Sequence, residues 1–70
     1  MKSKATLEYW TLDYSMAKES YYLKGNIYND KLKRFPDGQR IYTSRLEKIN
    51  FQDGWAKTKN STYKLGACGI

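Results

Sequence analysis

The residues of this chain that could take part in chemistry are mainly bases and aromatic rings. Lys31, Lys33 and Arg34 form a basic cluster directly before Phe35. Further bases then interleave with aromatic side chains along the rest of the chain. Proteins that bind single-stranded nucleic acid use this combination, because the rings stack on bases while Lys and Arg meet phosphates. The candidate partner-binding residues are Lys31, Lys33, Arg34, Arg40, Tyr42, Arg45, Trp55, Lys57, Lys59 and Tyr63.

The same residue types have two other interpretations. Trp, Tyr and Arg also dominate the energetic centres of protein interfaces, so the partner is either a protein or a nucleic acid. If the predicted hairpins pair, Tyr42, Trp55 and Tyr63 are candidates for one exposed face of the sheet. Alternatively, Trp55 and Tyr63 are cross-strand partners in the core. Composition does not decide among these interpretations.

Catalytic and metal-binding patterns are not found in the sequence. It contains no histidine and one cysteine, Cys68, which removes the usual general base and the usual ligand sets for zinc. The seven acidic residues are scattered, and the turn-forming pairs Asp37-Gly38 and Asp53-Gly54 account for two of them. The glycines stand singly, so no phosphate-binding loop is predicted. We therefore expect neither an enzyme nor a cofactor or metal ion.

Net charge and length narrow the class of partner. The chain has 70 residues and a formal charge of +6. Residues 1–30 carry four bases and four acids, whereas residues 31–70 carry nine bases and three acids. A basic surface attracts nucleic acid or acidic protein surfaces. A lone cysteine indicates a reducing compartment, and neither a signal peptide nor a long apolar run is recognised, so we expect a cytoplasmic protein without a membrane partner.

Turn residues and alternating hydrophobicity predict five strands. Pro36 and Asp37-Gly38 form a tight turn that leads into a β-branched and aromatic run, and Asp53-Gly54 predicts a hairpin. Gly25, in the middle of a strand, predicts a bulge, a bend or the close approach of another backbone. The inward face changes within the third strand, which indicates either a bulge near Thr43-Ser44 or a strand that ends and resumes, and we favour the bulge. The predicted strands cover residues 6–14, 21–28, 39–50, 55–59 and 62–65.

These strands predict an all-β fold. We expect one domain over residues 1–70, a five-stranded antiparallel meander that closes into an SH3-like barrel, with an OB-like barrel as the alternative. Residues 1–5 and 67–70 are expected to be flexible tails. An unpaired edge strand would allow a homodimer. The predicted core is Leu7 or Trp10, together with Leu12, Leu23, Ile27, Phe35, Ile41, Leu46, Ile49, Ala56 and Leu65.

Residues 25–66 resemble a group of small proteins from bacteriophages and prophages. The resemblance is carried by the segments 25–30 and 34–38, and by Ile41, Thr43-Ser44, Thr58, Ser61, Tyr63 and Leu65-Gly66. Such groups are similar to the accessory proteins that phages use against host defences, including anti-CRISPR inhibitors. The resemblance implies a non-enzymatic inhibitor in the bacterial cytoplasm that binds a host protein or protein complex. Binding of RNA or single-stranded DNA is the alternative function.

Overall fold

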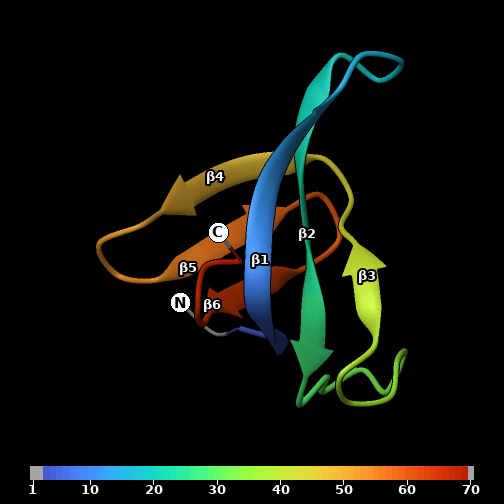
Figure 1. The fold of residues 1–70 in the computed structure, drawn as a ribbon, viewed down its shortest axis with the longest axis vertical. Helices are drawn as coiled ribbons and strands as arrows, with labels where there is room; N and C mark the ends of the chain where they lie inside the picture. The colour runs from blue at the N-terminus through green and yellow to red at the C-terminus, as the bar shows by residue number, and fades with distance from the viewer. Residues whose placement is uncertain (1–2, 70) are drawn as a thin grey trace.

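A single six-stranded sheet forms the body of the protein. The computed structural model describes residues 3–69. The sheet has the order β3-β2-β1-β6-β5-β4, in which β1 and β6 are parallel and the other neighbours antiparallel (Figure 1). This confirms the predicted all-β class, although the sheet is mixed. The strands are β1 (Ala5–Ser15), β2 (Ser20–Tyr28), β3 (Arg40–Tyr42), β4 (Leu46–Asn50), β5 (Trp55–Thr58) and β6 (Thr62–Leu65).

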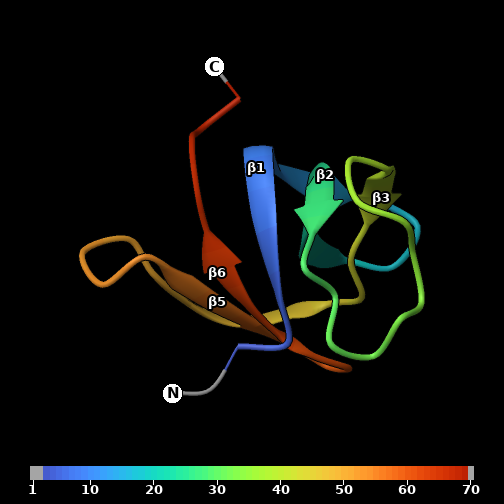
Figure 2. The same ribbon diagram turned by 90° about the horizontal axis from the view of Figure 1, so that it is seen from below.

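The prediction of a closed five-stranded barrel is wrong. The predicted strand 39–50 is divided into β3 and β4, which lie at opposite edges of the sheet. Residues 43–45 between them change partner, because the Thr43 N–H donates to the Leu23 carbonyl of β2 while the Arg45 carbonyl accepts from Lys59 N–H. The sheet order of the described residues contains no β3–β4 pairing, so the sheet remains open. Figure 2 shows the strong bend, with β2 and β3 seen nearly end-on and β5 and β6 running across the view.

A bulge in β1 places an odd-numbered residue, Leu7, and an even-numbered one, Trp10, on the same core side of the sheet. Glu8 pairs with Asn26 and Thr11 with Lys24, so Tyr9 and Trp10 together lie opposite Gly25. Tyr9 has a φ of 51°, and its side chain is exposed. As a result Leu7 is buried and Trp10 also packs against the core. The two residues that the sequence left as alternatives are thus both core residues.

Gly25 is required by this bulge. A Cβ atom at position 25 would lie 3.2 Å from the Glu8 carbonyl oxygen and 3.2 Å from both Cα and Cβ of Trp10. Two of these three atoms belong to the backbone, which a side-chain rotation cannot move away. The predicted close approach of another backbone is therefore confirmed. Gly38 and Gly54 also fit the predicted turns, with φ values of 88° and 74°.

The core is small and lies on the concave side of the bent sheet. It is built from Ala5, Leu7, Leu23, Ile27, Ile41, Ala56 and Tyr63, with Trp10, Phe35, Leu46, Ile49 and Leu65 packed against it. The prediction for Leu12 is wrong, because this side chain is 40% exposed. It lies at the start of an arm, residues 12–22, in which β1 and β2 project beyond the other strands (Figure 1). No helix within residues 3–69 is long and apolar enough to span a bilayer.

The segment after β6 is held against β1, contrary to the expectation of a flexible tail. Trp10 is the main anchor: its indole Nε1 donates to the Gly66 carbonyl at 3.0 Å. Its backbone N–H donates to Ala67, and its carbonyl accepts from Gly69 N–H at 2.8 Å. At the other end, Ala5 is buried and Lys4 N–H donates to the Thr62 carbonyl at 2.7 Å. The remaining residues of the two predicted tails, 1–2 and 70, lie outside the described part.

Candidate nucleic-acid interface

The aromatic residues predicted from the sequence do not share one surface. Tyr63 is only 3% exposed and belongs to the core. It pairs with Ala56, whereas Trp55 pairs with Lys64, so Trp55 and Tyr63 point to opposite faces of the sheet. They are therefore neither neighbours on one surface nor cross-strand core partners. Tyr42 lies on β3, at the far edge from β5.

Arg34 is part of a structural network rather than a free binding group. Its Nε and Nη2 atoms both donate to the Asp30 carboxylate at 3.1 Å, and its Nη1 donates to Ser61 Oγ at 2.9 Å. The Asp30 carboxylate also accepts from the backbone N–H groups of Leu32 and Arg34. Hydrogen bonds from the Arg34 side chain lower the pKa of Asp30, and the same bonds raise the pKa of Arg34. The pair fixes the 30–34 loop against the turn that contains Ser61.

Three further bases of the prediction lie close to acidic groups. Lys31 and Lys33 are exposed and border a hollow that Asp30 and Asp37 also line. Lys57 Nζ lies 3.9 Å from Glu47 Oε1 in an exposed ion pair. Exposed pairs of this kind add little stability, but the nearby carboxylates reduce the attraction of these positions for an anion. The basic cluster predicted from the sequence, Lys31, Lys33 and Arg34, therefore carries less uncompensated positive charge in the structure than the sequence suggests.

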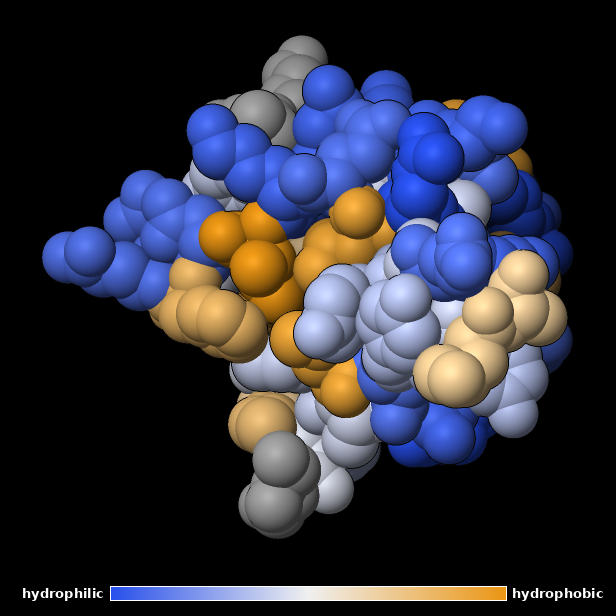
Figure 3. Space-filling model, turned by 90° about the horizontal axis from the view of Figure 1, so that it is seen from above, coloured by the Kyte–Doolittle hydropathy of each residue, from blue (hydrophilic) through white to orange (hydrophobic). Residues whose placement is uncertain are grey.

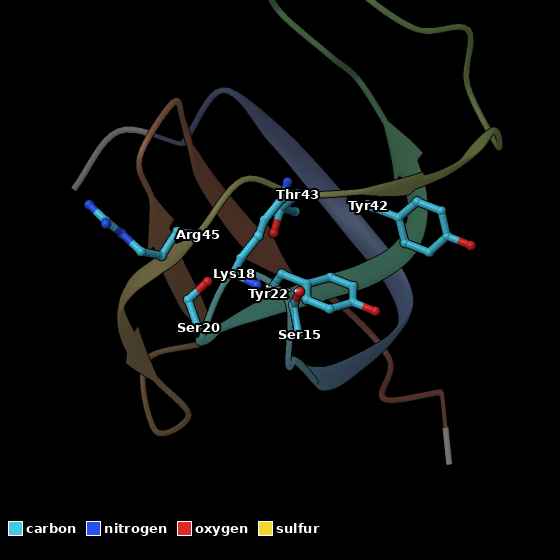
Figure 4. Close-up of a pocket in the computed structure, with 7 residues that line it drawn as sticks. All are labelled: Ser15, Lys18, Ser20, Tyr22, Tyr42, Thr43 and Arg45. Carbon is cyan, nitrogen blue, oxygen red and sulfur yellow. Dashed lines mark hydrogen bonds between the residues drawn. The ribbon is translucent and has the colours of Figure 1, made fainter.

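A hollow between the arm and the 43–45 connection brings Tyr42 and Arg45 together with residues that the sequence did not indicate. Its volume is about 270 Å³, and we call it the tyrosine hollow. The turn between β1 and β2, the outer face of β2 and β3, and the connection 43–45 contribute its walls. Figure 4 shows the Tyr22 and Tyr42 rings on one side of it and the Arg45 guanidinium directed away from them. The lining residues are Ser15, Lys18, Ser20, Tyr22, Tyr42, Thr43 and Arg45.

Two tyrosine rings are in contact on the outer face of β2 and β3. Tyr22 and Tyr42 meet edge to face, with centroids 6.0 Å apart and planes at 71°, while Tyr42 remains 70% exposed. Lys24 pairs with Tyr42 across the strands, and its Nζ lies 5.6 Å from the centre of that ring. Arg40 lies two residues before Tyr42 and donates to Asn26 Oδ1 at 3.0 Å. This face therefore combines an accessible ring with several cations.

Lys18 and Tyr22 are the main site residues that sequence reasoning missed. They belong to residues 1–30, where the formal charges cancel, so this half seemed electrostatically neutral. A usable signal was present, because alternation placed Tyr22 and Lys24 on the polar face of their strand. Lys59, predicted from the sequence, does not line the tyrosine hollow but borders a second hollow together with Lys18 and Arg45.

A separate apolar surface lies on the opposite face of the arm and on the β4–β5 loop. We call it the apolar arm face and define it by Leu12, Tyr14, Tyr21 and Phe51, which are 40–62% exposed. Tyr14 and Tyr21 meet edge to face at 4.9 Å, and Phe51 stacks on Trp10 at 5.9 Å. Figure 3, viewed from the end with the arm, shows hydrophobic residues gathered near the middle of this end and surrounded by hydrophilic ones.

Comparisons with known proteins do not identify a family. No family model matches the chain, and neither a curated protein nor a solved structure matches it.

Proposed function

We propose that this protein is a non-enzymatic binding module that holds single-stranded RNA or DNA on the tyrosine hollow and the adjoining outer face of β2 and β3. The observation that carries the proposal is the exposed Tyr42 ring, which contacts the half-buried Tyr22 beside Lys18 and Arg45, in a hollow that no carboxylate lines. An exposed ring accepts any base by stacking, while neighbouring cations neutralise phosphates. The net charge of +6 supports the same partner by long-range attraction.

Replacing Tyr42 distinguishes base stacking from general charge attraction. We expect Tyr42→Leu to weaken binding of a fluorescein-labelled dT12 or rU12 strand by about 5- to 100-fold, because stacking contributes roughly 1–3 kcal/mol per base. Fluorescence anisotropy at several salt concentrations measures this. The wild-type log affinity should fall linearly with log salt, by about 0.7 for each phosphate contact.

Tyr14→Leu is the matched control for that experiment. Tyr14 is also an exposed tyrosine in an edge-to-face pair, but it lies on the other face of the arm. It should leave strand binding at the wild-type level. The proposal fails if the wild type does not bind either strand at low salt, or if Tyr42→Leu binds as tightly as Tyr14→Leu.

The second candidate function is binding of a host protein, as the phage resemblance implies. The apolar arm face favours it, because aromatic side chains that are exposed together are typical of interface centres. In this case Phe51→Ser should abolish capture of one stoichiometric partner from nuclease-treated bacterial lysate, measured by affinity pull-down and mass spectrometry. Tyr42→Leu should leave that capture intact. Retention of the same partner by Phe51→Ser would exclude the apolar arm face as its binding site.

A further inference from the structure

A second hollow adjoins the tyrosine hollow and collects three bases. Its volume is about 310 Å³, and we call it the three-base hollow. Lys18, Ser20 and Arg45 line both hollows, so the two share a wall. Figure 4 shows the Arg45 side chain extending away from the tyrosine rings, on the side of Ser20. The residues around the three-base hollow are Lys18, Ser20, Ser44, Arg45, Lys59 and Asn60.

Backbone hydrogen bonds hold the walls of the three-base hollow in place. Lys59 N–H donates to the Arg45 carbonyl at 2.9 Å, and Asn60 N–H donates to Ser44 Oγ at 3.1 Å. On the side of the arm, Lys18 N–H donates to Ser15 Oγ at 3.2 Å. The segments 44–45 and 59–60 are thus joined to each other, while the turn that carries Lys18 is closed by its own bond. Each of these three segments contributes one base to the hollow.

The charge of the three-base hollow is not balanced by the protein. In the part of the chain that the structure describes, the ion pairs are Asp30–Arg34 and Glu47–Lys57, so none involves Lys18, Arg45 or Lys59. Glu19 follows Lys18 in the chain but lines neither hollow. Three neighbouring cations repel one another, and an anion between them removes this repulsion. The hydroxyl groups of Ser20 and Ser44 add neutral donors.

We propose that the three-base hollow binds a backbone phosphate of a single strand while a neighbouring base of that strand stacks on Tyr42. Phosphate oxygens accept charge-assisted hydrogen bonds from Lys and Arg together with bonds from hydroxyl groups, which is the donor set present here. The inference rests on the proposed nucleic-acid function and adds the place where the phosphate is held. It also gives the path of the strand over the protein surface, between the tyrosine rings and the turn after β5.

Lys59→Gln tests this inference, because Lys59 lines the three-base hollow and not the tyrosine hollow. We expect dT12 to bind about tenfold more weakly, as for loss of one charge-assisted contact. The salt slope should also become shallower by about 0.7, the value for one single-strand phosphate contact. Anisotropy titrations across a salt series give both quantities, and circular dichroism verifies that the variant is folded.

Lys57→Gln is the matched control. It also removes one lysine charge, two residues before Lys59, but the Lys57 ammonium lies beside Glu47. It should leave the salt slope unchanged. If Lys57→Gln and Lys59→Gln lose the same affinity for dT12, the attraction is a general effect of charge and the inference is overturned. Wild-type binding by Lys59→Gln, with weak binding by Tyr42→Leu, would overturn the inference alone. Absence of binding by the wild type would overturn both the inference and the proposed function.

Discussion

Asp30→Ala is expected to lower the free energy of unfolding by about 3–5 kcal/mol, because it leaves the Arg34 guanidinium without its buried partner. The Asp30 side chain is 1% exposed and accepts four hydrogen bonds, two from the Arg34 side chain and two from backbone N–H groups. A domain of this size has a net stability of only about 3–5 kcal/mol. The variant should therefore be largely unfolded at 25 °C, as measured by circular dichroism and urea titration.

Asp37→Ala is the control for the loss of one negative charge in the same region. Asp37 is exposed and accepts one hydrogen bond, from Asn29 N–H at 2.9 Å. Its replacement should cost about 1 kcal/mol. If the two variants lose equal stability, the Asp30–Arg34 pair does not hold the loop.

The same pair predicts the response of the wild type to acid. Its hydrogen bonds lower the pKa of Asp30 below the ordinary value of 3.8 that applies in the unfolded chain. A lowered native pKa means that the stabilisation is complete above the ordinary value and is lost as the pH falls through the native one. Asp30→Asn, which keeps the shape of the side chain, should therefore show a flatter stability profile below about pH 4. Parallel profiles for the wild type and Asp30→Asn would contradict this.

Trp10→Ala is expected to cost about 3 kcal/mol and to release the segment after β6. The indole packs on the core, stacks on Phe51 and donates to the Gly66 carbonyl. Removing a large packed ring loses its contacts and leaves a cavity. The effect on stability is measured by urea titration. Hydrogen exchange of the Gly69 amide, which donates to the Trp10 carbonyl, reports release of the segment.

Trp10→Phe separates ring packing from the indole hydrogen bond. Phenylalanine keeps most of the apolar contact and lacks the Nε1 donor, so a loss of about 1 kcal/mol is expected. If Trp10→Phe is as unstable as Trp10→Ala, the bond to Gly66 and not the packing is the main contribution. If Trp10→Ala retains wild-type stability and Gly69 protection, Trp10 does not anchor the segment.

Local patterns predicted the strands well because alternation and turn residues act over short distances. The expected strands 6–14 and 21–28 lie within β1 and β2, and Gly25 meets another backbone as its position implied. The change of inward face within residues 39–50 indicated an irregularity near Thr43-Ser44, but the predicted bulge is instead a break between β3 and β4, because the change of partner depends on where β5 lies. The parallel pairing of β1 with β6 is likewise a contact between distant segments. Alternation also placed Leu12 on the face of the sheet that carries the core residue Leu23. It could not show that Leu12 lies beyond the part of this face that the core covers.

The candidate site was only partly predictable, because the sequence does not show which charges meet. Asp30 counts among the acids of the neutral first half, yet it pairs with Arg34 of the basic second half. That pairing occupies Arg34, a predicted binding residue. It also leaves the bases of residues 1–30 with one acidic residue fewer to balance their charge. Lys18, one of these bases, lines the three-base hollow. Tyr42, Arg45 and Lys59 were among the candidates predicted from the sequence, but which residues lie beside them depends on the fold.

The position of β6 between β1 and β5 also determines when the domain can fold during synthesis. Residues 63–65 pair with residues 5–7, so the middle of the sheet joins segments from the two ends of the described chain. Such non-local contacts must close a long loop first, which slows folding. A nascent chain can form the β1–β2 hairpin early, but β1 keeps an unpaired edge until residues 63–69 have left the ribosomal exit tunnel. During that interval the exposed edge is open to pairing with other chains.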